Sequence, residues 1–432
     1  MINPLKLILS GAVMLLTSSA LAVDIEGVQP AALDQPRVNV TLRRDVKGKP
    51  LSAKGGGLGG LLGGGADADQ SVINIQAFLD TGASGIMISG KTAESLGIKH
   101  MTIRRGGKDE PIQFHDIGVG GSDAFEVSEK LFVYMAPESG EPDDESEYTI
   151  GFGPIRGQIS QGGGLIEQLT GGLDVMGMPA MKGRIIVLDP KPVNSFGDTM
   201  KVQILSPKQR QQIPKTDLHV KLTYVDFKRF TRIEPPGAEF PVVSANPMIG
   251  PDPTNPAASK AAGAQGGAVI ASHNGKQVAG TWLLDTGAAA SMISKRAAEQ
   301  LGVRYVAGTE GGENPKLANI PDDKQFSLSI GGVGGTKKVA GFFLDSLTLP
   351  TRERQPIVYK PAPVMVVDIT VEDPKTRQQV TLDGVFGMNF MVASAFVSQA
   401  GLMPDIKNLT QGPFEWVVFD EPAGMLGLKM KK

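Results

Sequence analysis

The sequence predicts a mainly β protein built from two related lobes within one chain. Glycine (55) and proline (30) make up about a fifth of the 432 residues, which favours strands, turns and loops over long helices. An apolar content of 41% at this length allows two cores of ordinary domain size. Residues 79–97 and 284–302 are identical at twelve of nineteen aligned positions, and such a repeat determines the architecture.

The first 22 residues have the features of an export signal. Lys6 supplies positive charge, residues 7–16 form a short apolar core, and Ala20-Leu21-Ala22 fits an A-x-A cleavage site. An uncleaved anchor is the alternative, but polar residues interrupt the apolar run and it is short for a spanning helix. We therefore expect residues 1–22 to be a removed signal peptide, and the protein to be periplasmic or secreted without a stable membrane span.

Charge and residue usage exclude several classes of function. The formal net charge of −2 gives no basic footprint for nucleic acid, so we expect no nucleic-acid partner. The absence of cysteine excludes disulfides and thiol catalysis. The four histidines show no metal-ligand spacing, so we expect neither a metal nor another cofactor.

Each copy of the repeat predicts a strand that leads directly into Asp-Thr-Gly. In the first copy, residues 72–79 alternate apolar with small or polar side chains, as in a half-buried strand. In the second, residues 269–273 and 276–284 flank Asn274-Gly275, a dipeptide that favours a tight hairpin turn. The order strand, turn, strand is thus expected before the second motif.

A short helix is expected after each motif. Ser89 and Ser294 can cap the first turns of these helices, and Gly97 and Gly302 can end them in the left-handed conformation. Each copy therefore continues from its strand into a short helix.

Proline-rich and glycine-rich stretches divide the rest of the chain. Prolines between residues 190 and 214 place a boundary there, giving lobes at 23–205 and 206–432. Residues 55–65 and 247–267 have too few large apolar side chains to pack a core, and we interpret them as loops.

Two further pairs of segments repeat in the same order. The sequence Gly-Val-Gly-Gly occurs at Gly118-Val119-Gly120-Gly121 and at Gly332-Val333-Gly334-Gly335. An apolar-apolar-Gly signature occurs at Val175-Met176-Gly177 and at Val385-Phe386-Gly387. Three ordered matches indicate an internal duplication.

The duplicated Asp-Thr-Gly motif predicts a pair of carboxylates. A two-fold arrangement of similar lobes can bring Asp80 and Asp285 face to face, and two carboxylates that share a site keep one proton between them. One is then a general base and the other a general acid, although the sequence does not show which is which. The expected supporting residues allow close backbone approach or donate hydrogen bonds: Thr81, Gly82, Ser84, Thr286 and Gly287.

These motifs resemble those of the pepsin and retropepsin superfamily of aspartic peptidases, over most of the mature chain. The resemblance implies two acid-protease-type β-barrel lobes with a cleft between them, and it places the apolar-apolar-Gly signatures behind the catalytic turns. It also implies that the two Gly-Val-Gly-Gly segments are flap tips, although ordinary hairpin turns use glycine pairs as well. Ala83 and Ala288 depart from the Ser that two-lobed members usually carry after Asp-Thr-Gly.

The expected function is an aspartic-type endopeptidase that hydrolyses peptide bonds with a water activated between Asp80 and Asp285. Its partner would be a protein or peptide substrate, and we expect a monomer whose lobes pair within the chain. One alternative is a non-catalytic bilobal module that binds a peptide or a cell-envelope ligand. Another is a protease that acts mainly on its own chain.

Overall fold

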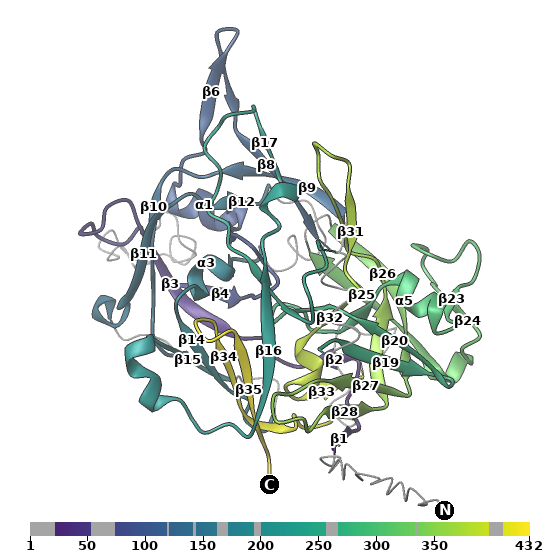
Figure 1. Ribbon diagram of the computed structural model, residues 1–432. Helices are drawn as coiled ribbons and strands as arrows, with labels where there is room; N and C mark the ends of the chain where they lie inside the picture. The colour runs from purple at the N-terminus through teal and green to yellow at the C-terminus, as the bar shows by residue number, and fades with distance from the viewer. Residues whose placement is uncertain are drawn as a thin grey trace, which may run out of the picture.

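The computed structural model describes residues 22–52, 74–118, 121–140, 144–161, 172–193, 200–255, 267–332, 335–396 and 409–432. Strands dominate this part of the chain (Figure 1), which confirms the prediction of a mainly β protein. Neither large sheet closes into a barrel among the described strands. Residues 1–21 of the predicted signal peptide and the insert at 55–65 lie outside the described residues.

The first large sheet is built mostly from the N-terminal half of the chain and has ten strands. In spatial order they are β11 (Ile150–Ile155), β10 (Leu131–Met135), β3 (Arg37–Arg43), β4 (Ile75–Leu79), β13 (Val175–Met176), β5 (Ile86–Ile88), β12 (Gln158–Ile159), β9 (Gly121–Val127), β8 (Gln113–Gly118) and β17 (Arg232–Glu234). The alternating burial of β4 agrees with the period predicted from the sequence.

The second large sheet has twelve strands and draws mostly on the C-terminal half. In spatial order they are β15 (Lys201–Leu205), β14 (Ile185–Asp189), β34 (Phe414–Asp420), β35 (Met425–Met430), β16 (Leu218–Val225), β18 (Asn246–Ile249), β21 (Trp282–Leu284), β32 (Gly384–Phe386), β22 (Met292–Ile293), β29 (Ala362–Val366), β26 (Gly335–Leu344) and β25 (Gln325–Gly332).

The same strand order occurs in both sheets. The run β3-β4-β13-β5-β12-β9-β8 matches β18-β21-β32-β22-β29-β26-β25. The pairing directions also match: the strand before each Asp-Thr-Gly pairs in parallel with the apolar-apolar-Gly strand, and the last two strands form an antiparallel hairpin. The repeat in the sequence therefore has a counterpart in the order and direction of the strands.

Smaller sheets and short helices complete the described fold. A five-stranded sheet contains β1 (Val23–Glu26), β28 (Ile357–Lys360), β27 (Ser346–Leu349), β19 (Val269–His273) and β20 (Lys276–Gly280). The two-stranded pairs are β2 (Ala31–Ala32) with β33 (Ser394–Ala395), β6 (Thr102–Arg105) with β7 (Lys108–Pro111), β23 (Arg304–Tyr305) with β24 (Leu317–Ala318), and β30 (Thr370–Glu372) with β31 (Gln379–Thr381). The helices are α1 (Gly90–Leu96), α3 (Met178–Met181), α5 (Lys295–Gln300), η2 (Glu145–Glu147), η3 (Pro207–Gln212), η4 (Lys228–Phe230), η5 (Asp322–Lys324) and η6 (Met388–Phe390).

The capping predictions for the two short helices are confirmed. The Ser89 hydroxyl accepts a hydrogen bond from the Thr92 amide at the start of α1, and Ser294 accepts one from Ala297 at the start of α5. Gly97 and Gly302 follow these helices with φ of 59° and 88°, where a side chain would be strained.

Two details of the second copy differ from the prediction. The hairpin turn at Asn274-Gly275 forms with positive φ at both residues, but the strand expected over 276–284 breaks at Thr281. Its first part, β20, joins the five-stranded sheet, and its second part, β21, joins the twelve-stranded sheet. The segment interpreted as a loop from Pro247 also begins within β18, because that strand pairs with β16 and β21.

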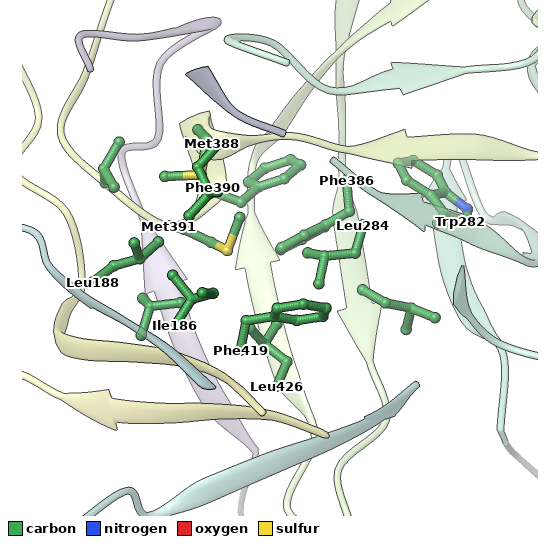
Figure 2. Packing of buried hydrophobic residues seen from close by; sticks show 14 of the residues in the cluster. Ile186, Leu188, Trp282, Leu284, Phe386, Met388, Phe390, Met391, Phe419 and Leu426 are labelled. Atoms are coloured by element: carbon green, nitrogen blue, oxygen red, sulfur yellow. The ribbon is translucent and has the colours of Figure 1, made fainter. Parts of the chain in front are cut away.

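A continuous apolar core lies beneath the second Asp-Thr-Gly strand (Figure 2). Leu284 of β21 and Phe386 of β32 are fully buried, and Phe386 stacks on Phe390 with ring centroids 5.2 Å apart. Ile186 of β14 and Phe419 of β34 belong to the same cluster. Burying side chains of this size stabilises the fold by about 1.5–3 kcal/mol each, which makes this core a rigid support for the strand.

The two halves of the chain are joined by shared strands. β14 precedes the predicted boundary at residue 205, yet it pairs with β34 near the C-terminus. β17 follows that boundary, yet it pairs with β8 of the first large sheet. β1 pairs in parallel with β28. The boundary itself stays a prediction. Within the described ranges, no helix has the length and apolar character needed to cross a membrane.

Candidate active site

The two Asp-Thr-Gly loops leave their sheets at equivalent positions. Asp80 follows β4, and its amide donates a hydrogen bond to the Met176 carbonyl at 3.1 Å. Asp285 follows β21, and its amide donates to the Phe386 carbonyl at 3.0 Å. Each aspartate is thus placed by the strand that carries the apolar-apolar-Gly signature.

The threonines of the two loops hydrogen-bond to each other's backbone. The Thr81 hydroxyl donates to the Leu284 carbonyl at 2.7 Å and accepts from the Thr286 amide at 3.0 Å. The Thr286 hydroxyl donates to the Leu79 carbonyl at 2.6 Å and accepts from the Thr81 amide at 3.0 Å. Both threonines are buried, so these bonds are shielded from water and fix one loop against the other.

The glycines of the motifs let the carboxyl groups of the two loops come together. A Cβ atom on Gly82 would lie 2.5 Å from Cγ of Asp285, and one on Gly287 would lie 2.3 Å from Cγ of Asp80. Any side chain at either glycine would overlap the opposite carboxyl group. The structure therefore brings Asp80 and Asp285 together, as the sequence predicted, although their catalytic role stays a prediction.

Backbone amides also orient the carboxyl groups. Oδ1 of Asp80 accepts hydrogen bonds from the amides of Gly82 at 2.7 Å and Ala83 at 3.2 Å. Oδ1 of Asp285 accepts one from the amide of Ala288 at 2.8 Å. Ala83 and Ala288 thus serve the carboxyl groups through their backbones. Among the described residues, no hydrogen bond joins the Ser84 hydroxyl to Asp80, and the supporting role expected for Ser84 stays a prediction.

Burial controls the protonation of the pair. It raises the pKa of Asp80, against hydrogen bonds that lower it. Burial raises the pKa of Asp285 well above its ordinary value, and the neighbouring charge of Asp80 adds to this shift. Because two adjacent carboxylates cannot both ionise cheaply, the pair retains one proton at pH values where an exposed aspartate has lost its own.

Gly177 and Gly387 lie directly behind the two loops. A Cβ atom on Gly177 would lie 2.4 Å from the Ala83 carbonyl oxygen, and one on Gly387 would lie 2.9 Å from that of Ala288. The amides of Met178 and Met388 donate to the same two carbonyls at 2.9 Å and 2.8 Å. The repeated signature therefore ends in glycine because backbone packs against backbone there.

Two side-chain amides at the site were missed from the sequence. The Asn246 amide donates to the carbonyls of Thr81 and Gly82, each at 3.0 Å. The Gln35 amide donates to the Gly287 carbonyl. Neither residue belongs to a motif. Their position is the one available signal: Gln35 lies just before β3, which pairs with β4, and Asn246 begins β18, which pairs with β21. Each side chain reaches the Asp-Thr-Gly loop of the other half.

A pocket of about 800 Å³ opens above the two carboxyl groups. Residues of both Asp-Thr-Gly loops line it, and its surface is mostly apolar, with Phe78, Met87, Phe230, Leu328 and Val371 among the lining residues. Ser84 also lines it. A pocket of this size and character suits an extended or drug-sized organic ligand.

Two hairpins bound this pocket where the sequence predicted flaps. β8 and β9 pair up to Gly118 and Gly121, and β25 and β26 pair up to Gly332 and Gly335. Gly118 and Gly331 line the pocket. The tip residues Val119, Gly120, Val333 and Gly334 lie outside the described residues, so the hairpins are observed and the flap role stays a prediction.

Among the described residues, no group of three or more His, Asp and Glu side chains is arranged to hold a metal ion. No protein-family model matches the chain, and no curated protein sequence matches it significantly. The assignment of function therefore rests on the site itself.

Proposed function

We propose that this protein is an exported aspartic endopeptidase, in which two lobes of one chain enclose a substrate cleft with Asp80 and Asp285 at its base. The observation that carries the proposal is the contact of each motif glycine with the opposite carboxyl group, since it holds two half-buried carboxyls as a pair in the lining of a large pocket. Such a pair combines a general base and a general acid.

In the proposed reaction, a water molecule lies between the two carboxyl groups. The ionised carboxyl takes a proton from this water, and the water oxygen attacks the scissile carbonyl carbon. The protonated carboxyl hydrogen-bonds the carbonyl oxygen and stabilises the negative charge that develops there. The C–N bond then breaks as the carboxyl that took the proton from water passes it to the leaving nitrogen, which releases an amine and a carboxylic acid. The backbone amides of Gly82, Ala83 and Ala288 keep the carboxyl groups oriented throughout.

The proposal is tested by replacing each aspartate with the isosteric amide. Asp80→Asn and Asp285→Asn should each lower peptide hydrolysis by about 100-fold or more, because general acid–base groups contribute at least that much. Circular dichroism should show an unchanged fold. The double variant should be no worse than either single variant, since the two groups act as a unit.

A variant that retains more than about a tenth of wild-type turnover would contradict the shared pair. Binding of unfolded peptide without cleavage by the wild-type protein would indicate a binding module instead. Cleavage confined to the protein's own chain would indicate self-processing.

A further inference from the structure

A third aspartate, Asp116, lines the same pocket and takes no part in the proposed reaction. It lies on β8, in the hairpin that bounds the pocket. Its Oδ1 accepts a hydrogen bond from the Ile117 amide at 2.9 Å, and its Oδ2 faces the Gln158 amide at 3.5 Å, the limit of a hydrogen bond. Burial raises the pKa of Asp116, against the hydrogen bonds from Ile117 and Gln158 that lower it.

The position of Gln158 places Asp116 close to the Asp80 loop. Gln158 is buried in β12, and its Nε2 atom lies only 2.4 Å from where a Cβ on Gly85 would be. Gly85 belongs to the turn that follows the first Asp-Thr-Gly. The carboxyl group of Asp116 therefore lies across Gln158 from the turn that carries Asp80.

The pocket lining near Asp116 suits a long substrate side chain with an apolar stem and a positively charged end. Met87 and Ile117 line the pocket here and offer apolar surface. Among the described residues that line the pocket, the charged ones are Asp80, Asp116, Asp285 and one cation, Lys338. Oδ2 of Asp116 has only the weak Gln158 partner in a mostly apolar surrounding, and an incoming cation would offset the cost of burying this charge by forming a charge-assisted hydrogen bond.

We propose that Asp116 is a specificity-determining residue that binds the ammonium or guanidinium group of a lysine or arginine side chain in the substrate. The aliphatic part of that side chain lies along the apolar wall, and its charged end reaches the carboxylate, as lysine and arginine do on mixed surfaces. This inference rests on the proposed peptidase function, and it narrows the substrates to chains with a basic residue at one fixed distance from the cleaved bond.

The test compares matched peptides that carry lysine, arginine or norleucine, which lacks the charged group, at each position around one cleavage site. The wild-type protein should prefer the basic peptides by about tenfold or more in kcat/KM at one position, as expected for a hydrogen bond to a charged group. Asp116→Asn should abolish that preference, so that its kcat/KM becomes equal for the basic and norleucine peptides. Asp116→Lys should favour glutamate at the same position.

Asp123→Asn is the matched control. Asp123 lies opposite Asp116 in the antiparallel pairing of β8 and β9, but it is exposed and does not line the pocket. Its replacement removes the same charge from the same hairpin and should leave the preference unchanged. Loss of the preference in this control would show that it comes from overall charge and would overturn the assignment.

Other outcomes separate this inference from the proposed function. Cleavage by the wild-type protein without any basic preference would overturn the role of Asp116 and leave the peptidase intact. An equal loss of cleavage for all peptides in Asp116→Asn would also overturn it. If no peptide is cleaved, calorimetric binding of the lysine and norleucine peptides still decides: equal affinities would contradict the role of Asp116.

Discussion

The two halves of the molecule have matching sheets and Asp-Thr-Gly loops, but the hairpins that bound the pocket are held differently in each half. Both halves have the same order of strands, the same Asp-Thr-Gly loop and a glycine packed behind that loop. In the first half, β8 lies between β9 and β17. In the second half, β25 is the last strand of its sheet among the described residues. The outer strand of one hairpin is therefore held on both sides, and that of the other on one side.

The two hairpins differ because the strand that supports β8 comes from outside the repeated segments. β17 comes from the segment between the two copies, outside the repeat. Ile117 of the first hairpin also packs against Phe230, Val371 and Val380, which likewise lie outside the repeated motifs. The repeated segments thus form the symmetric pair of Asp-Thr-Gly loops, whereas segments outside the repeat make the two hairpins differ. We expect substitutions in the two Asp-Thr-Gly loops to lower the rate of the proposed reaction. We expect substitutions in the hairpins to change substrate access and substrate choice.

Substitutions of the glycines in the two Asp-Thr-Gly loops should lower activity more than substitutions of the side-chain amides that support these loops. Gly82→Ala and Gly287→Ala each place a methyl group within about 2.5 Å of the opposite carboxyl group. A displacement of the carboxyl groups by about 1 Å should lower kcat by about 100-fold, with overpacking costing about 1–3 kcal/mol of stability. Gly267→Ala is the control, because a Cβ there meets nothing within 4 Å. Equal activity of all three variants would refute the close contact of the two loops.

Replacing the side-chain amides of Asn246 and Gln35 should lower activity less, and by different amounts. Asn246→Leu leaves two loop carbonyls without their donor, and Asn246 is buried, so kcat should fall about tenfold and stability by about 1–3 kcal/mol. Gln35→Ala removes one hydrogen bond from a half-buried side chain and should have a smaller effect on both. Steady-state kinetics with thermal unfolding measure this order. The reverse order would show that the second loop depends more on its amide.

The raised pKa values predict a pH-dependent effect on stability. Because burial raises the pKa of Asp285 in the folded protein, the folded state holds a proton that the unfolded state has released above pH ~4. This carboxyl therefore destabilises the fold as pH rises through that range. Asp285→Asn should raise Tm by a few degrees near pH 7, and the gain should disappear below pH ~4. A gain that is the same at both pH values would argue against a shifted carboxyl.

The hairpins should differ in local opening. Hydrogen exchange measured by NMR should be slower for backbone amides of β8 than for those of β25, because β8 has a strand on each side. Breaking the β17 pairing with Ile233→Pro should accelerate exchange in β8 and leave β25 unchanged. Equal exchange in both hairpins of the wild-type protein would show that β17 adds no rigidity.

The sequence predicted those parts of the structure that depend on short, repeated patterns. The strands before Asp80 and Asp285, the capped helices after them and the glycine hairpins could be predicted because local chemistry determines them. Gln35 and Asn246 could not, since each acts on a loop far away in the chain. Asp116 could not be identified either, because only the folded hairpin brings it to the pocket. The pairing of β17 with β8 depends on long-range register, which no local pattern in Arg232–Glu234 reveals.

The most direct test of the central claim is a cleavage assay on the purified protein. It is incubated with unfolded protein across pH, with and without pepstatin, and new termini are read by mass spectrometry. We expect pepstatin-sensitive cleavage that is fastest in the weakly acidic to near-neutral range, because burial keeps the shared proton on the pair to higher pH and no side-chain hydroxyl stands at Ala83 or Ala288. Absence of new termini, or cleavage that persists when both Asp80 and Asp285 are replaced by Asn, would contradict it.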